Sequence, residues 1–266
     1  MTEIDLVVVN YKTPKLVQRL MDCLNEDDDG ETWSLHVIDN ASGDDSVELL
    51  DSMYRSRDYK ISTLMRSSVN MGFARACNLT ADRGKAKYIG LLNADVWMNT
   101  SDVKGIIKSF EENHSADIIG PKQRDEDGYI THAGIFGPND KPAHRGWKKY
   151  DPDDKWFKDF VPATTVSGSA YFVRRNRWEE LTDCKIYKKF APHAKGAFLP
   201  TQHYYEETFC SYHARAHGMG VYYDGRVSIG HTWHASSPVG GHADGLFSES
   251  REIFRRACDA HDIARD

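Results

Sequence analysis

The feature that most constrains this chain is an alternation of short apolar segments with segments of helical periodicity in its N-terminal part. Buried strands are expected at residues 4–9, 35–38, 61–65 and 88–92, and helices with apolar residues three and four positions apart separate them. Each strand and helix together span roughly 25–30 residues, which is typical of a parallel sheet with helices on both faces. The sequence therefore predicts an α/β fold with a mostly parallel central sheet.

Capping residues and the spacing of apolar residues indicate where the expected helices begin and run. Thr13 is a candidate N-cap and Pro14 suits the first helical position, followed by apolar residues at positions 16, 17, 20, 21 and 24. Two more helices are expected over residues 46–54 and 73–81.

Polar residues gather where the predicted strands end. They are Asn10, Asp39 with Asn40, Asn70, and Asn93 with Asp95. Ligands of parallel α/β sheets bind outside the carboxyl ends of the strands, so these side chains outline a crevice of nucleotide size. Asn and Asp also end strands and cap helices without binding anything. That explanation suffices for one strand end, whereas four successive ends favour a binding site.

The second half of the chain has a different character. Residues 121–162 are rich in Asp, Lys, Pro and Gly, with Trp147, Trp156 and Phe157 interleaved. This composition indicates a loop-rich insertion. The insertion either covers a site and contacts an acceptor, or forms a surface excursion with its own apolar cluster.

The remaining elements complete one continuous domain. We expect an apolar segment over 165–173, a helix over 204–216, short strands at 221–223 and 227–229, and a C-terminal amphipathic helix over 248–264. We interpret residues 1–120 as a donor-binding half and residues 121–266 as an acceptor-binding and catalytic half.

Charge and hydropathy narrow the class of protein. The chain carries 34 Lys and Arg against 40 Asp and Glu, and this net charge of −6 gives no general attraction for nucleic acid, although it leaves room for a local basic groove. The longest apolar runs, such as residues 6–9, are too short to span a bilayer, and the acidic N-terminus is unlike a signal peptide. We expect a soluble, cytoplasmic protein without integral membrane association.

The five cysteines are Cys23, Cys77, Cys184, Cys210 and Cys258. They lie far apart and form no C-x-x-C pair, so their spacing suggests neither a zinc site nor a disulfide framework. We expect free, buried thiols.

Common phosphate-binding and hydrolytic motifs are missing from the sequence. It contains no G-x-G-x-x-G after the first strand, no G-x-x-x-x-G-K-[ST] and no G-x-S-x-G. Without such a backbone cradle, a bound diphosphate needs a metal ion to neutralise its charge. Hard divalent ions prefer oxygen ligands, and Asp95 is the best-placed carboxylate.

Six segments occur in an order and spacing typical of one family. They are residues 7–11 (VVVNY), 37–44 (VIDNASGD), 70–78 (NMGFARACN), 91–95 (LLNAD), 166–175 (VSGSAYFVRR) and 205–210 (YEETFC). Over about residues 3–235 the chain resembles family 2 glycosyltransferases of the GT-A fold, especially their rhamnosyltransferase-like branch. The resemblance implies a GT-A fold and a transferase that uses a nucleotide-diphosphate sugar.

The resemblance also implies roles for the strand-end residues. Asp39 would meet the uracil or ribose of the donor, unless it only caps the following turn, and Asn10 would lie in the same crevice. Asn70 and Arg75 would approach the nucleotide and its phosphates. The segment from Asn93 to Asp95 replaces the family's D-x-D motif, with Asn at its first position. Asp95 would then bind Mn²⁺ or Mg²⁺ through the diphosphate, and Asn93 would face ribose or sugar hydroxyls.

Glu206 and Glu207 match the acidic pair that begins the family's catalytic helix. The second position is the expected general base, which assigns that role to Glu207. The family more often has Asp there, and a displacement near 1 Å matters in catalysis, so Glu206 stays an alternative. Two acids that complement a helix dipole are the structural alternative.

A late histidine is the remaining metal ligand that the resemblance implies. His231 follows the last core strand, and His234 competes with it for this role. A surface imidazole without a ligand is the alternative for His231. Trp233 either stacks on a sugar or packs internally.

The predicted reaction is metal-dependent transfer of a sugar from a UDP- or dTDP-sugar to an acceptor hydroxyl. A base opposite the leaving group gives inversion, and no second carboxylate is placed as a nucleophile. A nucleotidyltransferase is disfavoured because the segment after the first strand is not rich in glycine and basic residues.

The acceptor is expected to be a saccharide or envelope glycan. Modified DNA is an alternative, because aromatic residues (Trp147, Tyr150, Trp156, Trp233) stack on sugars or bases and the insertion is locally basic (Lys141, Arg145, Lys148, Lys149, Lys155, Lys158). A non-catalytic binder of nucleotide sugars or carbohydrates is a further alternative, prompted by Asn93 and Glu207.

Overall fold

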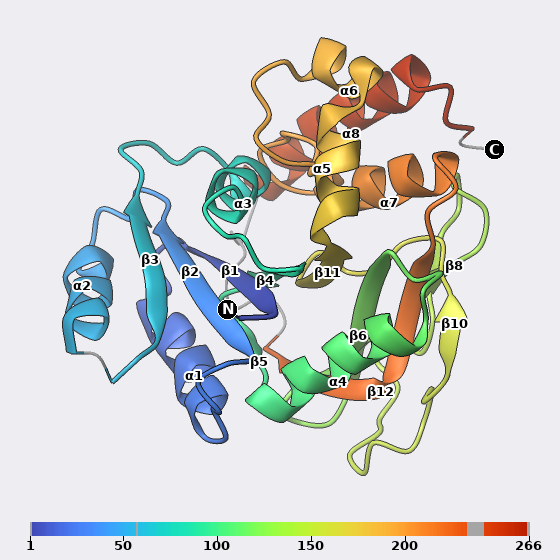
Figure 1. The fold of residues 1–266 in the computed structure, drawn as a ribbon. Coiled ribbons are helices and arrows are strands. Elements are labelled where there is room, and N and C mark those ends of the chain that lie inside the picture. Colours follow the sequence, from blue (N-terminus) through green and yellow to red (C-terminus); the bar gives the residue numbers. More distant parts are fainter. Residues whose placement is uncertain (1, 57, 233–241, 265–266) are drawn as a thin grey trace.

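The computed structural model describes residues 2–56, 58–232 and 242–264 (Figure 1). Strands and helices alternate over residues 4–93 as the sequence predicts, whereas the strands at 96–97 and 118–124 and the helix at 100–112 were not predicted. The elements of the first half are β1 (Ile4–Asn10), α1 (Pro14–Asn25), β2 (Trp33–Asp39), α2 (Ser46–Ser56), β3 (Ile61–Arg66), α3 (Phe73–Ala81), β4 (Tyr88–Asn93), β5 (Val96–Trp97), α4 (Thr100–Glu112) and β6 (Ile118–Arg124).

The second half contains short strands, one long strand and four helices within the described ranges. Its elements are β7 (Ile130–His132), β8 (Ile135–Phe136), β9 (Ala143–His144), β10 (Phe160–Pro162), β11 (Ala170–Arg174), α5 (Arg175–Asp183), α6 (Lys185–Phe190), α7 (Glu206–Ala216), β12 (Val221–His231) and α8 (His242–Ala260).

Several local expectations need correction. The two short strands expected at 221–223 and 227–229 are one strand, β12, whose pairing with β6 is irregular between Asp224 and Ser228. Thr13 makes no side-chain capping hydrogen bond at the start of α1. Instead, Asn10 Oδ1 accepts the backbone N–H of Thr13 at 3.2 Å, because the end of β1 lies directly before the helix. Ala170 begins β11, so the preceding small residues of the apolar segment form a loop.

The predicted α/β fold with a mixed, mostly parallel central sheet is confirmed. The strands follow the order β10-β12-β6-β11-β4-β1-β2-β3, with β5 beside β12 and β7 beside β6. Strands β4, β1, β2 and β3 are parallel neighbours, and β12 is parallel to β6. Antiparallel β11 lies between β4 and β6 and joins the two parallel parts.

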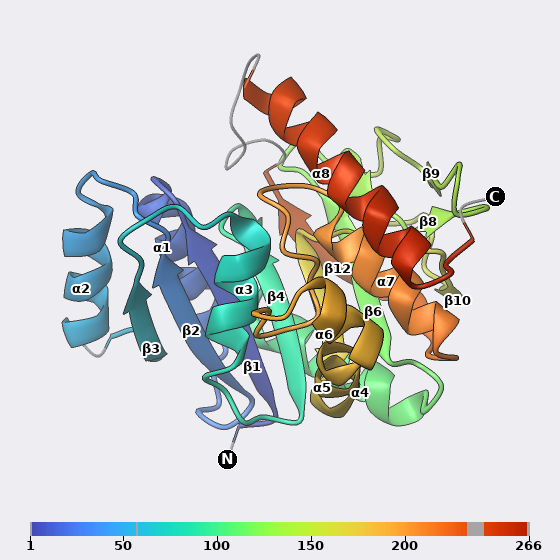
Figure 2. The same cartoon turned by 90° about the horizontal axis from the view of Figure 1, so that it is seen from above.

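Helices cover both faces of the sheet (Figures 1 and 2). One apolar core includes Leu20 of α1 and Phe110 of α4, and the core on the other face includes Cys77 of α3 and Cys210 of α7. A third cluster joins α6, α7 and α8 outside these two cores. None of the helices in the described ranges is both long and apolar enough to cross a bilayer.

The 121–162 insertion is fastened to the sheet by buried charge. Lys122 of β6 is fully buried, and its ammonium contacts Asp151, Asp154 at 2.8 Å and the carbonyl of Trp156 at 2.6 Å. Ile130 of the insertion belongs to the core cluster that includes α3 and α7. The insertion therefore packs into the main core, which contradicts a surface excursion with its own apolar cluster.

Candidate active site

The carboxyl ends of β1, β2 and β4 meet because these strands are parallel neighbours. Asn10 is paired with Asp39 in the register of β1 and β2, and Val9 is paired with Asn93 in that of β1 and β4. Asp95 follows two residues after Asn93. The structure thus brings the polar residues of three strand ends to one edge of the sheet, where α/β folds bind ligands.

Asn10 and Asp39 form a buried network at this edge. Asn10 Nδ2 donates to Asp39 Oδ1 over 2.8 Å, and Ser42 donates to the same carboxylate through its hydroxyl and through its backbone N–H, the latter at 3.1 Å. Both Asn10 and Asp39 are almost completely buried. The network orders the turn after β2, and a direct contact between Asp39 and a nucleotide stays a prediction.

A cavity of about 330 Å³ lies at the strand ends, and we call it the strand-end cavity. Asn70 and Asn93 of the predicted site line it, together with Asn40. Asn40 Nδ2 donates to Asn70 Oδ1 over 3.0 Å, and Met71 N donates to Asn40 Oδ1 over 3.0 Å. These bonds hold the loop before α3 against the end of β2. The volume is within the range of sites for small molecules.

Other lining residues were not singled out from the sequence. Tyr11 and Lys12 follow β1, and Lys12 has a left-handed backbone with φ of 61°. Gln202 and His203 come from the loop before α7, and burial lowers the pKa of His203. Lys12, two residues after Asn10, was a visible signal for an anionic ligand. The loop residues gave no local signal because they reach the cavity from a distant part of the chain.

Gly72 allows the loop before α7 to close one side of the cavity. Its φ is 83°, and a Cβ atom there would lie 2.5 Å from the carbonyl oxygen of Gln202. The neighbouring Phe73 N donates to that same oxygen at 3.2 Å. Only glycine fits both the left-handed backbone and this close approach.

Asp95 and His231 come together at the same end of the sheet. His231 Nε2 lies 3.5 Å from Asp95 Oδ1, and both residues are buried. The pairing of β12 with β5, which sets His231 opposite Val96, holds the imidazole beside the carboxylate. Within the described residues, His231 Nδ1 is buried without a hydrogen-bond partner. His234, the predicted alternative to His231 as a metal ligand, and Trp233, the predicted stacking or packing residue, lie outside the described residues.

The Asp95 and His231 pair has a donor set that fits a divalent ion such as Mn²⁺. A carboxylate oxygen and an imidazole nitrogen are both accepted by this ion, and two protein ligands leave positions for phosphate oxygens. His132 is near His231, and its pKa is well below the ordinary value because of burial and because of the nearby His144 and His231. A neutral His132 adds no positive charge that would repel a metal ion.

The two glutamates at the start of α7 have different surroundings. Glu206 is buried, accepts a hydrogen bond from Thr201 Oγ1 at 3.3 Å, and has its pKa raised to about 8 by burial and by the charge of Glu207. Glu207 is only partly buried, and burial also raises its pKa. The preceding Tyr204 and Tyr205 have φ of 72° and 68°, a left-handed pair that turns the chain into the helix.

Glu207 lies against the small-residue loop before β11. A Cβ atom on Gly168 would lie 3.1 Å from Glu207 Cγ, so the glycine leaves room for the glutamate. In the same loop, Ser169 O accepts the backbone N–H of Asn93 at 2.9 Å. Through this loop Glu207 is connected to the end of β4, whereas Glu206 contributes to raising the pKa of Cys77 on α3.

Arg75 lies away from the strand-end cavity, and several basic residues of the insertion are paired with acidic side chains. Arg75 is exposed on α3, donates to Met71 O at 3.4 Å, and is not among the cavity's lining residues. Several basic residues of the insertion have acidic partners. These pairs are Arg145–Asp159 at 2.7 Å, Lys155–Asp153 at 2.7 Å and Lys158–Asp154 at 2.9 Å. Much of the insertion's positive charge is therefore compensated locally.

Comparison with known proteins defines the class. The sequence pattern of Glycosyl transferase family 2 matches residues 5–180, which is more than half of the chain. A site at the strand ends of a GT-A-like sheet is the arrangement of a nucleotide-sugar glycosyltransferase. The chain belongs to Glycosyl transferase family 2. No curated protein matches its sequence.

Solved structures agree on the fold. S. aureus TarS (residues 1–349) in complex with UDP-GlcNAc matches with a TM-score of 0.62 and 14% identity, over 98% of this chain and 66% of that one. The complex of TarS with UDP gives a TM-score of 0.63 and 15% identity, over 100% of this chain and 68% of that one. GalNAc-T7 with UDP, GalNAc and Mn²⁺ matches with a TM-score of 0.67 and 13% identity, over 97% of this chain and 48% of that one. The chain thus spans about two thirds of the TarS chains and about half of GalNAc-T7.

Proposed function

We propose that this chain transfers a sugar from a UDP-sugar to an acceptor hydroxyl with inversion and with the help of a divalent metal ion. The observation that carries the proposal is the buried Asp95 and His231 pair at 3.5 Å, at the same sheet end as the strand-end cavity. Transfer requires stabilisation of the departing diphosphate and removal of a proton from the acceptor. The described residues provide candidates for both tasks.

The strand-end cavity is the proposed donor site. Asn70 and Asn93 present amide groups to the cavity, and Lys12 adds a cation suited to a diphosphate. The complexes of TarS with UDP-GlcNAc and UDP support a UDP-sugar as the first choice. A dTDP-sugar, as the likeness to the rhamnosyltransferase branch suggests, is the second. Asp39 would act on the nucleotide directly or by holding the turn that carries Asn40, and Arg75 would contact phosphate only after its side chain reorients.

Asp95 and His231 would hold Mn²⁺ or Mg²⁺. When bound, such an ion neutralises the negative charge that develops on the leaving diphosphate. The Mn²⁺ in GalNAc-T7 favours Mn²⁺ here. The pairing of His231 with Val96, together with the backbone hydrogen bond from Thr232 N to Asp95 O at 2.9 Å, holds the two residues side by side.

Glu207 is the proposed general base. It is partly exposed and lies beside Gly168, whereas Glu206 is buried and hydrogen-bonded to Thr201. A raised pKa makes Glu207 a stronger base, and positioned bases contribute about 10²–10⁴-fold to rate. A single displacement with this base on the face opposite the diphosphate inverts the anomeric centre.

A saccharide is the proposed acceptor. Trp147, Tyr150 and Trp156 of the insertion are partly or largely exposed and suited to stacking on sugar rings. The acid partners of Arg145, Lys155 and Lys158 weaken the case for a DNA acceptor, since phosphate binding relies on available cations.

The deciding experiment measures nucleotide release from a panel of UDP-, GDP- and dTDP-sugars, with and without Mn²⁺. We expect Mn²⁺-dependent release from one donor, abolished in Asp95→Ala and lowered about 10²–10⁴-fold in Glu207→Gln. Glu179→Gln, which changes an exposed glutamate of α5, is the matched control and should retain nucleotide release.

Retention of the anomeric configuration in the product would exclude the proposed inverting mechanism. Tight UDP binding without turnover of any donor, with saccharide acceptors present, would identify a non-catalytic binder.

A further inference from the structure

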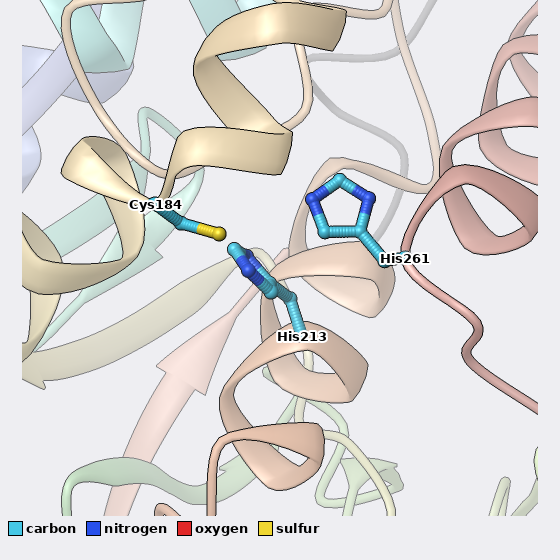
Figure 3. Close-up of side chains that lie close together, drawn as sticks. All are labelled: Cys184, His213 and His261. Carbon is cyan, nitrogen blue, oxygen red and sulfur yellow. The ribbon is translucent and has the colours of Figure 1, made fainter.

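A second group of metal-binding side chains lies toward the C-terminal end of α7, away from Glu206 and Glu207. Cys184 precedes α6, His213 belongs to α7, and His261 follows α8. Figure 3 shows the three side chains directed toward one another, and one ligand atom of each lies within 4.8 Å of the others. Three separate segments thus bring one sulfur atom and two imidazole rings close together.

The imidazoles in this group lack the partners that buried polar atoms normally have. His213 is fully buried, and neither of its ring nitrogens has a hydrogen-bond partner among the described residues. His261 Nδ1 lies 2.8 Å from Ala257 O, an arrangement in which the nitrogen donates to the carbonyl. His261 Nε2 then carries a lone pair, and this atom is buried without a partner in the described part of the chain. Unpaired buried polar atoms are costly, and a bound metal ion would give these nitrogens a partner.

A fourth side chain completes the set. His217 Nδ1 lies 3.0 Å from His213 O, which leaves Nε2 as the nitrogen with a free lone pair. That Nε2 is 3.9 Å from Cys184 Sγ. Carbonyl groups therefore orient both His217 and His261, as is usual for histidines that bind metal.

We propose that Cys184, His213, His217 and His261 bind one Zn²⁺ ion. Four protein ligands through sulfur and nitrogen form a closed, tetrahedral zinc site, and one thiolate with three imidazoles supplies only such atoms. Zn–S and Zn–N bonds of about 2.3 and 2.0–2.1 Å place ligand atoms roughly 3.3–3.7 Å apart. The present separations, up to 4.8 Å among Cys184, His213 and His261 and 3.9 Å between Cys184 Sγ and His217 Nε2, are longer, so binding requires side-chain rotations that bring the ligand atoms together.

The softness of the ligand atoms favours the same ion. Mg²⁺ and Mn²⁺ prefer oxygen ligands, and no carboxylate belongs to the group. Binding releases the thiol proton of Cys184.

The site would brace the helix that begins with Glu206 and Glu207. It connects α6, α7 and the segment after α8, which already share an apolar cluster. The proposal is independent of the proposed transferase reaction. The cysteine spacing suggested no zinc site, because only one cysteine takes part and the histidines come from the end of α7 and from the segment after α8.

The test is metal titration of the purified full chain after treatment with a chelator. We expect one Zn²⁺ per chain, a Co²⁺ complex with a sulfur-to-metal charge-transfer absorption, and loss of that absorption when Zn²⁺ is added. Cys184→Ser removes the absorption, and His261→Ala weakens Zn²⁺ binding about tenfold or more. Cys23→Ser and His114→Ala, at another thiol and an exposed imidazole, retain both signals.

A further variant separates this site from the one proposed at the strand ends. Asp95→Ala retains the Co²⁺ absorption, whereas it loses Mn²⁺-dependent nucleotide release. The wild-type titration decides the question even where a ligand variant does not fold, which circular dichroism reports. Absence of Zn²⁺ binding by the wild type at micromolar concentration, or an unchanged absorption in folded Cys184→Ser, would overturn the proposal.

Discussion

Glu206 and Glu207, which are neighbours at the start of α7, have the same side chain in two different environments. Glu206 points into the protein and is held by Thr201, whereas Glu207 lies next to Gly168. The sequence predicted an acidic pair at a helix start, and the structure shows that pair in the first turn of α7. Burial distinguishes the two, and burial depends on tertiary contacts that the local sequence does not contain.

The raised pKa of Glu206 makes stability depend on pH. The folded carboxyl stays protonated up to about pH 8, whereas an unfolded glutamate ionises near pH 4.5. Between these values unfolding releases a proton, so the free energy of unfolding falls as pH rises, by at most about 1.4 kcal/mol per pH unit for this group. We expect urea denaturation across this window to show the fall, and Glu206→Gln to flatten it.

Glu179→Gln, at an exposed position on α5, should leave the pH dependence unchanged. An equal slope in Glu206→Gln and the wild type would show that Glu206 ionises normally in the folded protein. Glu207 contributes in the same direction, since its pKa is also raised, so part of the slope remains in the variant.

Among the elements, the parallel strands and their helices were predictable and the later ones less so. The strands β1 to β4 have apolar runs bounded by turn residues, and these local signals locate them within two residues. Strand β12 was predicted as two pieces because its irregular middle, around Gly225, reads as a turn. Helices α4, α5 and α6 were not expected, and α6 is only 6 residues long.

The contact between Gly72 and the loop before α7 is an element-scale feature that can be tested. In Gly72→Ala we expect a loss of stability of about 1–3 kcal/mol from the left-handed backbone, together with a higher KM for the donor, because the new Cβ displaces Gln202 from the cavity. Donor titrations of nucleotide release measure the KM, and thermal unfolding measures the stability.

Gly30→Ala is the matched control for this substitution. Gly30 has φ of 79° and no atom within 4 Å of an added Cβ, so its variant carries backbone strain without a steric contact. Its stability should fall while the donor KM stays at the wild-type value. An unchanged KM in Gly72→Ala would mean that the loop does not control donor binding.

At the scale of the whole molecule, one buried lysine joins the insertion to the sheet. Lys122 is fully buried between Asp151 and Asp154. Lys122→Met leaves two carboxylates without their cation, and we expect a loss of about 3–5 kcal/mol in urea denaturation. Lys155→Met breaks only the exposed pair with Asp153 and should cost no more than about 1 kcal/mol. Similar losses in both variants would show that the buried pair has no special role.

The overall architecture followed from the sequence to a larger extent than the site did. The spacing of strands and helices predicted the α/β fold, and the strand-end asparagines and Asp95 pointed to one sheet edge. The contribution of Gln202 and His203 to the cavity, and the meeting of Cys184 with three histidines, depend on how distant segments pack. Of these residues, only His213 and His217 have a spacing that the sequence displays, since they are four positions apart; the other contacts have no local motif.

The position of β12 has a consequence for synthesis of the chain on the ribosome. The strand carries His231, and it pairs with β10, β6 and β5 and emerges from the ribosome after the segment that carries Asp95. A nascent chain that ends after β11 already holds Asp95 but lacks the imidazole beside it. The proposed metal site is therefore assembled only once translation has passed β12.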